Sequence, residues 1–107
     1  MIIKYCIVNL YIVYDVYLSI QTPLIVDCKD EKWDELETPY GTSTIEVVSN
    51  ADRSKYDGII FLNVKDAWYD DADYQDGQTI YVTFSSNQIK SVDNDGSWDM
   101  NDKNIYK

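Results

Sequence analysis

The sequence contains no histidine and only two cysteines among its 107 residues. Without an imidazole, neither Cys6 nor Cys28 has the usual general base, so we predict no cysteine nucleophile. The same absence excludes a mixed thiol–imidazole metal site. Only four glycines are present, and they form no glycine-rich phosphate-binding loop. These absences remove three common kinds of catalytic or binding site.

Positive charge is also scarce, because 9 lysines and arginines stand against 19 acidic residues. The resulting net charge of −10 repels nucleic acid and anionic membranes and attracts basic surfaces. We therefore expect no direct binding to nucleic acid or to a membrane. A host protein with a basic groove is the kind of partner that fits this charge.

The apolar N-terminus, MIIKYCIVNLYIVYDVYLSI, is not typical of a membrane span or a signal peptide. Lys4, Asn9 and Asp15 interrupt it, and no small-residue cleavage site follows. We interpret this segment as β-structure. Two thiols without a processing signal are typical of a reducing, cytosolic compartment. Whether Cys6 and Cys28 pair stays open.

The first half of the chain has the patterns of β-strands. Ten tyrosines favour sheet over helix. Val16, Leu18 and Ile20 alternate with polar residues, which is typical of a strand with one buried face. Residues 2–13 are apolar on both faces, and predict either a buried strand or one arm of a hairpin that turns near Asn9.

One helix is expected in the middle of the sequence. Ser43 and Glu46 have the spacing of a capping box, in which each side chain bonds the other residue's main chain at the start of a helix. We expect this helix to run to about Lys55. Gly58 then follows as a helix stop, because glycine adopts the left-handed conformation without steric cost.

Three further strands are predicted at residues 24–27, 59–64 and 79–84, and IIFLNV at 59–64 is expected to be central because it is apolar on both faces. The charged residues 29–42 are expected to form a loop. The tail, residues 91–107, is polar, and we expect it to be loosely held. Hydrophobic residues make up 45% of the chain, enough for one small core. The sequence therefore predicts a single α+β domain over residues 1–107, with a small, mostly antiparallel sheet and one short helix.

The densest acidic stretch is KDAWYDDADYQDGQ, residues 65–78. Its carboxylates suit a mimic of the nucleic-acid backbone that occupies a basic groove on a partner. The alternative is a solvated loop whose charges keep the protein soluble. A second acidic run near the C-terminus favours the mimic. The carboxylates assigned to this partner-binding surface are Asp66, Asp70, Asp71, Asp73, Asp76, Asp93, Asp95 and Asp99.

Parts of these two acidic runs have the spacing of a calcium-binding EF-hand loop. Neither run has glycine at the sixth position together with glutamate at the twelfth. No helices are expected on either side of them. We therefore predict no dedicated metal site.

All three tryptophans lie in acidic segments. A tryptophan beside carboxylates suits an anchor in a partner's pocket. It also suits a loop that folds back on a small core, where the ring buries apolar area. We favour the core for Trp33. For Trp68 and Trp98 both hypotheses stay open, and both residues are included in the partner-binding surface.

Several sequence blocks occur in an order that is similar to a known family. They are YLSIQTPLIVD at residues 17–27, Trp33, YDGIIFLNVKD at 56–66 and YVTFSSNQIKS at 81–91. With the tail NDKNIYK, they resemble the C-terminal half of the ADP-ribosyltransferase-like domain of polyvalent proteins from phages and mobile elements. The resemblance covers about residues 14–105 and implies a truncated ADP-ribosyltransferase fold. Thr22 departs from it, because the family often has asparagine there.

The resemblance also implies where a site would lie. In such transferases a carboxylate or amide at the end of the closing strand contacts the NAD ribose or the acceptor, and Gln88 matches that position. The family's first half carries a histidine or arginine for the adenosine ribose and a tyrosine that stacks on nicotinamide. Both would precede residue 17, where we find no such pattern. Because those contacts orient NAD for reaction, we expect the chain not to be an enzyme.

Our first hypothesis is therefore a non-catalytic, acidic protein of a phage or mobile element, without a cofactor, in the cytoplasm of the bacterial host. In its most concrete form it is an anti-CRISPR-like inhibitor on the nucleic-acid-binding surface of a CRISPR effector or other nuclease. The alternative is an NAD-dependent ADP-ribosyltransferase, or one half of a split one, with Gln88 in the active site. An exposed N-terminal strand also favours a homodimer through that strand.

Overall fold

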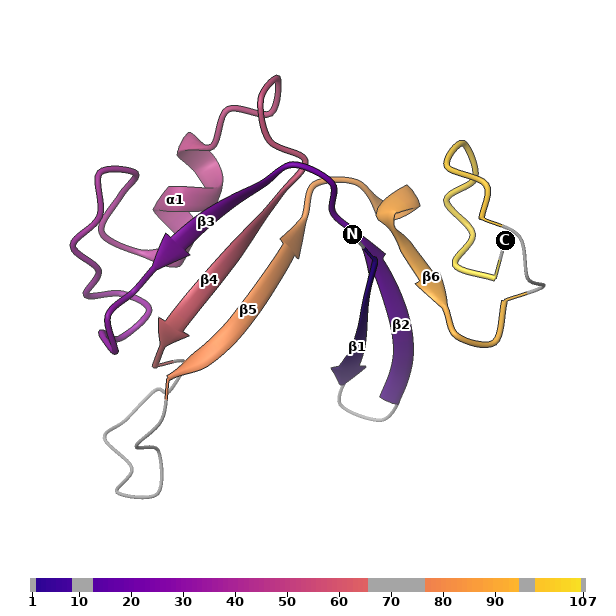
Figure 1. The fold of residues 1–107 in the computed structure, drawn as a ribbon, viewed down its shortest axis with the longest axis horizontal. Helices are drawn as coiled ribbons and strands as arrows, with labels where there is room; N and C mark the ends of the chain where they lie inside the picture. The colour runs from indigo at the N-terminus through magenta and orange to yellow at the C-terminus, as the bar shows by residue number, and fades with distance from the viewer. Residues whose placement is uncertain (1, 9–12, 66–76, 95–97, 107) are drawn as a thin grey trace. The chain divides into compact units, whose positions relative to one another are not determined.

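The structure is a computed structural model that describes residues 2–8, 13–65, 77–94 and 98–106 (Figure 1). The chain divides into two compact units. The first unit joins Met1–Gln21 with Thr83–Lys107, and the second is Thr22–Val82. No helix among the described residues is long and apolar enough to cross a membrane. The single-domain prediction for residues 1–107 stays a prediction.

The first unit contains a three-stranded sheet in the order β1-β2-β6. β1 (Ile2–Val8) pairs antiparallel with β2 (Val13–Ser19), from Ile2 opposite Ser19 to Val8 opposite Val13. β2 also pairs antiparallel with β6 (Ile89–Ser91). Residues 2–8 are thus one arm of a hairpin, as one of the two alternatives predicted. The turn near Asn9 lies outside the described residues.

The alternation that predicted β2 is confirmed. Val16, Leu18 and Ile20 are all at most 3% exposed, while Asp15 and Tyr17 at alternate positions are exposed. This pattern follows from the strand period of two, which places successive side chains on opposite faces of a sheet. β2 therefore contributes one apolar row to the core of its unit.

The second unit contains a sheet in the order β3-β4-β5. β3 (Pro23–Asp27) and β4 (Gly58–Val64) are parallel, and β5 (Gln78–Thr83) runs opposite to β4 on its other side (Figure 1). β4 is central, as its run of apolar residues predicted. The helix α1 (Thr44–Asn50) lies in the connection from β3 to β4, which a parallel pair requires.

The α+β class with one helix is confirmed, but the single sheet was wrong in detail. The described residues form two three-stranded sheets, and one of them contains a parallel pair. Two sheets form in place of one because the polar residues Gln21 and Thr22 end the first apolar run, and the next strand, β3, pairs in a separate sheet. Periodicity alone does not distinguish parallel from antiparallel pairing in short strands.

α1 begins where the capping box predicted and ends earlier than expected. The side chain of Ser43 accepts a hydrogen bond from the Glu46 main chain at 3.1 Å. The helix ends at Asn50 because Asp52 turns the chain: its side chain accepts from both the main chain and the hydroxyl of Ser54. Gly58 is accordingly the first residue of β4, so its assignment as the helix stop was wrong.

Candidate functional site

The candidate site is the turn that follows β5, at the Gln88 position singled out from the sequence. The turn contains a short 3₁₀ helix, η1 (Ser86–Gln88), which leads directly into β6. Gln88 is only 7% exposed. Its Oε1 accepts hydrogen bonds from the main-chain N–H groups of Phe84, at 3.0 Å, and Ser85, at 2.9 Å. The carboxamide therefore closes the turn from inside.

The other end of the same carboxamide connects the turn to β2. Gln88 Nε2 donates to the main-chain oxygen of Ser19 at 2.9 Å. An amide suits this position because it accepts through its oxygen and donates through its nitrogen. A carboxylate would lack the donor, and an aliphatic side chain would lack both. Gln88 therefore fixes the turn to the end of β2.

The side chains that remain on the outer side of the turn are small and polar. Ser85 and Ser86 are exposed, and Asn87 is half-buried. The Ser85 hydroxyl donates to Asn87 Oδ1 at 2.8 Å. Hydroxyl and amide groups of this kind both donate and accept hydrogen bonds. The turn thus presents a neutral polar edge supported by a buried amide.

A second buried polar group, Lys90, holds the C-terminal segment onto β6. Lys90 is 0% exposed, and its Nζ donates to the main-chain oxygens of Asp102, at 2.7 Å, and Asn104, at 3.0 Å. The neighbouring Ser91 N–H donates to the oxygen of Ile105 at 2.7 Å. The QIKS block, residues 88–91, is therefore joined to the NDKNI segment, residues 101–105, by hydrogen bonds to main-chain oxygens.

The tail also contacts η1. The Asn87 side chain donates to the main-chain oxygen of Met100, and the Trp98 indole N–H donates to the oxygen of Asn87 at 3.3 Å. Trp98 is half-buried, in keeping with a ring that folds its own segment onto the turn. The expectation of a loosely held tail was wrong, because its composition does not reveal that main-chain carbonyls are its attachment points.

Replacing Lys90 by methionine should release this tail. Methionine retains the length of the side chain but leaves the Asp102 and Asn104 oxygens without their donor. We expect the Ser91 amide to exchange its hydrogen about tenfold faster or more, because opening of the tail removes its acceptor. Hydrogen exchange measures this directly. Lys103→Met, at an exposed lysine in the tail, is the matched control, and equal protection in both variants would refute the attachment.

Most of the acidic residues predicted to bind a partner fall outside the described residues. These acids are Asp66, Asp70, Asp71, Asp73, Asp76 and Asp95. Trp68, which was assigned to the same surface, also lies outside the described residues. Asp93 and Asp99 are described and exposed, and Asp99 accepts a hydrogen bond from the Asn101 main chain. Among the described residues, no group of three or more acids or thiols could hold a metal ion. The acidic partner surface therefore stays a prediction.

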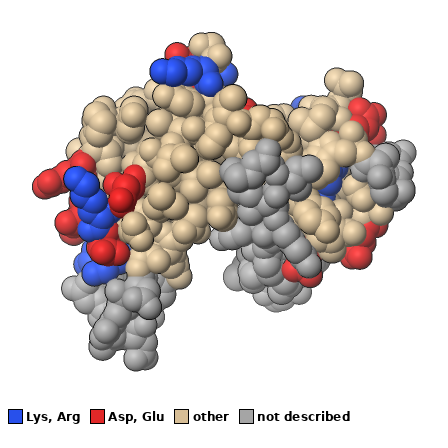
Figure 2. Space-filling view, viewed as in Figure 1, with Lys and Arg blue, Asp and Glu red and all other residues tan. Residues whose placement is uncertain are grey.

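A different acidic group does appear in the structure, in the loop between β3 and α1. Figure 2 shows red and blue side chains gathered over this loop. Its sequence, DEKWDELE at residues 30–37, contains more acids than bases. From the sequence, this charged segment was predicted only to be part of a loop.

Cys28 lies at the start of that loop as a free, buried thiol, 3% exposed. Burial, together with the nearby charge of Asp27, raises the pKa of this thiol to about 11. At neutral pH it is therefore protonated and a poor nucleophile. For Cys28 this agrees with the prediction from the sequence, whereas the prediction for Cys6 stays a prediction.

Two small sheets and one α-helix among the described residues are compatible with a small α+β domain of the ADP-ribosyltransferase-like kind. A family model described as ADP-ribosyltransferase in polyvalent proteins matches residues 7–99. The chain therefore belongs to this family, and the resemblance noted in the sequence is confirmed. No curated protein and no solved structure matched the chain.

The family match corrects the expectation that the chain is not an enzyme. The family is one of ADP-ribosyltransferases, which points to catalysis. That expectation placed too much weight on the absence of histidine and of a recognisable nicotinamide pattern before residue 17. Nothing in the comparisons supports the anti-CRISPR-like inhibitor, and the NAD-dependent alternative fits the family better. The dimer through β1 stays a prediction.

Proposed function

We propose that the chain acts as an ADP-ribosyltransferase domain that takes ADP-ribose from NAD. The observation that carries this proposal is the family match over residues 7–99. The intact closing turn supports it, because the family's closing motif is present and its amide is held in a defined position. In such a reaction the bond from ribose to nicotinamide breaks and the acceptor's nucleophile takes its place.

The polar edge of the turn fits a sugar better than a charged group. Ser85, Ser86 and Asn87 offer hydroxyl and amide groups, which pair well with ribose hydroxyls. These three residues are the ones we assign to ribose binding. A rigid turn would hold them in place before the substrate arrives, and such positioning is a large part of catalysis in group transfer.

Gln88 has a supporting role in this proposal. Its carboxamide already bonds Phe84, Ser85 and Ser19, so it acts through the turn that it closes. We therefore regard Gln88 as a positioning residue. Changing it should weaken NAD binding through loss of the turn's shape, while the hydroxyls of Ser85 and Ser86 remain in the chain.

Titration of the purified chain with NAD tests the proposal. Binding to the folded state should raise the free energy of unfolding, by about 2.7 kcal/mol when NAD is at roughly 100 times its dissociation constant. Thermal unfolding measures this rise, and assay of free nicotinamide measures turnover. ADP-ribose without the nicotinamide ring is the matched control ligand for the ribose contacts. Absence of both a shift and nicotinamide release would count against the proposal.

A further inference from the structure

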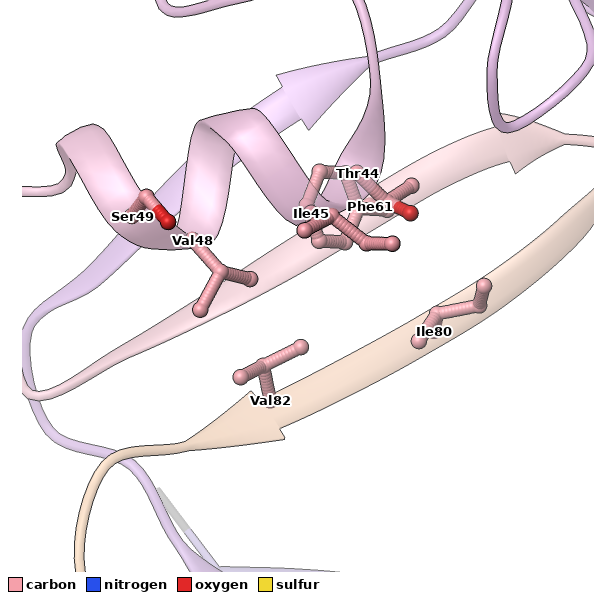
Figure 3. A pocket seen from close by; sticks show the side chains of 7 residues that line it. All are labelled: Thr44, Ile45, Val48, Ser49, Phe61, Ile80 and Val82. Atoms are coloured by element: carbon pink, nitrogen blue, oxygen red, sulfur yellow. The ribbon is translucent and has the colours of Figure 1, made fainter.

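A groove lies between α1 and the sheet of the second unit, with a volume of about 280 Å³. Figure 3 shows side chains of the helix on one side and of β4 and β5 on the other, directed toward the space between them. All of its lining residues belong to Thr22–Val82. They are Thr44, Ile45, Val48, Ser49, Phe61, Ile80 and Val82.

The groove is apolar and only partly covered. α1 buries Val47 completely, but Ile45 on the same helix is 67% exposed. Ile80 and Val82 are only half-buried on β5. Uncovered aliphatic side chains that line a depression are typical of a binding surface. Within the described residues of this unit, the helix thus covers only part of this face of the sheet.

The chemistry of the lining restricts what can bind there. None of the seven side chains ionises, and the only polar groups are the hydroxyls of Thr44 and Ser49. The anionic pyrophosphate of NAD would find no cation in this lining. Aliphatic side chains of a partner would fill the space without burying an unpaired charge.

The strand beside the groove indicates the conformation of the partner. In the described part of the chain, β5 is at the edge of its sheet. An edge strand pairs with an extended peptide, whose alternate side chains then point to one face. Ile80 and Val82 are two residues apart, so they follow that same alternation along the groove wall.

Charge then decides between partners. The chain carries −10, and the loop between β3 and α1 in the same unit contains the run DEKWDELE. A basic peptide is attracted to such a surface, whereas a second copy of this acidic chain is repelled. Glu46, next to Ile45, is exposed on the helix and adds to the local negative charge.

We infer that this groove docks the acceptor protein, through an extended basic segment with aliphatic side chains at alternate positions. That the docked protein is the acceptor of ADP-ribose depends on the proposed ADP-ribosyltransferase function. The docking of a basic segment in the groove does not depend on it. The segment pairs with the edge of β5 and inserts its aliphatic side chains between α1 and the sheet. Lysine or arginine side chains at the intervening positions are attracted by the overall negative charge of the chain.

The test uses a fluorescent nonapeptide of alternating valine and lysine, titrated with the full chain and followed by anisotropy. A peptide of alternating serine and lysine has the same charge without the aliphatic groups. We expect the valine–lysine peptide to bind roughly tenfold more tightly or better, because only it fills the groove. Equal binding of the two peptides would overturn the inference, since charge alone would then explain it.

Two variants locate the binding on the surface. Ile45→Lys places a charge at the groove, while Ile25→Lys makes the same change at an isoleucine on β3 that is also exposed, at 57%. We expect Ile45→Lys to weaken the valine–lysine peptide about tenfold more than Ile25→Lys does. Circular dichroism checks that both variants fold. Equal losses in the two variants would overturn the inference.

Self-association and NAD binding are followed separately. If sedimentation shows a dimer of the wild-type chain that Ile45→Lys disrupts, a second copy occupies the groove and the inference is wrong. NAD titration of the wild-type chain, without peptide, reports on the proposed function alone. Peptide docking with no response to NAD would retain the groove and reject the transferase. A response to NAD without peptide docking would support the transferase and overturn the inference about the groove.

Discussion

Replacing Gln88 by glutamate is expected to lower the free energy of unfolding by about 2–4 kcal/mol at neutral pH. The carboxylate can still accept from the Phe84 and Ser85 amides, but it cannot donate to the Ser19 oxygen. It would also carry a charge into a site that is only 7% exposed. Two oxygens would then face each other where an N–H now bridges β2 and the turn.

The pH dependence of this loss of stability shows whether it comes from the missing hydrogen-bond donor to the Ser19 oxygen or from a poor steric fit of the new side chain. Burial raises the pKa of a carboxyl group, and a protonated carboxyl can donate to Ser19. The loss caused by Gln88→Glu should therefore shrink as the pH falls. Denaturant unfolding at several pH values measures it, with Gln21→Glu, an exposed glutamine in the same unit, as the control. A loss that is small, or equal in both variants, would contradict the assigned role of the amide.

Replacing Gly77 by alanine is expected to cost about 1–3 kcal/mol of stability or more. A Cβ at this position would lie 2.5 Å from the Cα of Asn63, 2.8 Å from its carbonyl carbon and 2.7 Å from Asp30 Oδ1. Main-chain atoms cannot move aside as the tip of a flexible side chain can. Gly77 is therefore required by the close approach of its chain to β4.

The atoms that Gly77 approaches are themselves held in place. Asn63 has a φ of 54° inside β4, and Asp30 has a φ of 64°. The Asp30 N–H donates to the Asn63 oxygen at 2.8 Å, which fixes one to the other. Thermal unfolding of Gly77→Ala measures the cost, with the exposed neighbour Gln78→Ala as control. Equal stability of the two variants would mean that the main chain shifts to accommodate the added Cβ, and would contradict the requirement for glycine at position 77.

The left-handed backbone conformation of Asn63 is a feature of β4 that could not be predicted from the sequence. The run IIFLNV predicted a central strand, and β4 is central. Asparagine tolerates positive φ more readily than most residues, but nothing in the run itself signals this turn of the main chain. It depends on Asp30 and Gly77, which are distant in sequence. Asn63 Nδ2 also donates to Asp27 Oδ1 at 3.1 Å.

Asp27 illustrates a local effect that depends on the same fold. Hydrogen bonds from the Lys29 main chain and the Asn63 side chain hold its pKa below the usual value of 3.8. The spacing of Asp27 and Lys29 is visible in the sequence. The bond from Asn63 exists only because β3 and β4 are parallel neighbours in this register. Sequence patterns therefore predict which segments form strands, but not these contacts between them.

The candidate site was predictable in position and not in detail. The QIKS block located the turn, and Gln88 lies in it with three hydrogen bonds to the main chain. The role of Lys90 was missed, because a lysine in a short polar segment is usually solvated. Its partners are main-chain oxygens, which every residue carries.

The central claim is that this chain transfers ADP-ribose from NAD, and one measurement tests it most directly. The tagged chain is incubated in bacterial lysate with and without NAD, captured, and the intact masses of the chain and of everything retained are determined. The lysate supplies acceptors and, if the site is split, its other half. We predict a gain of one ADP-ribose on the chain or on a retained protein, only with NAD. Identical masses with and without NAD would contradict the claim.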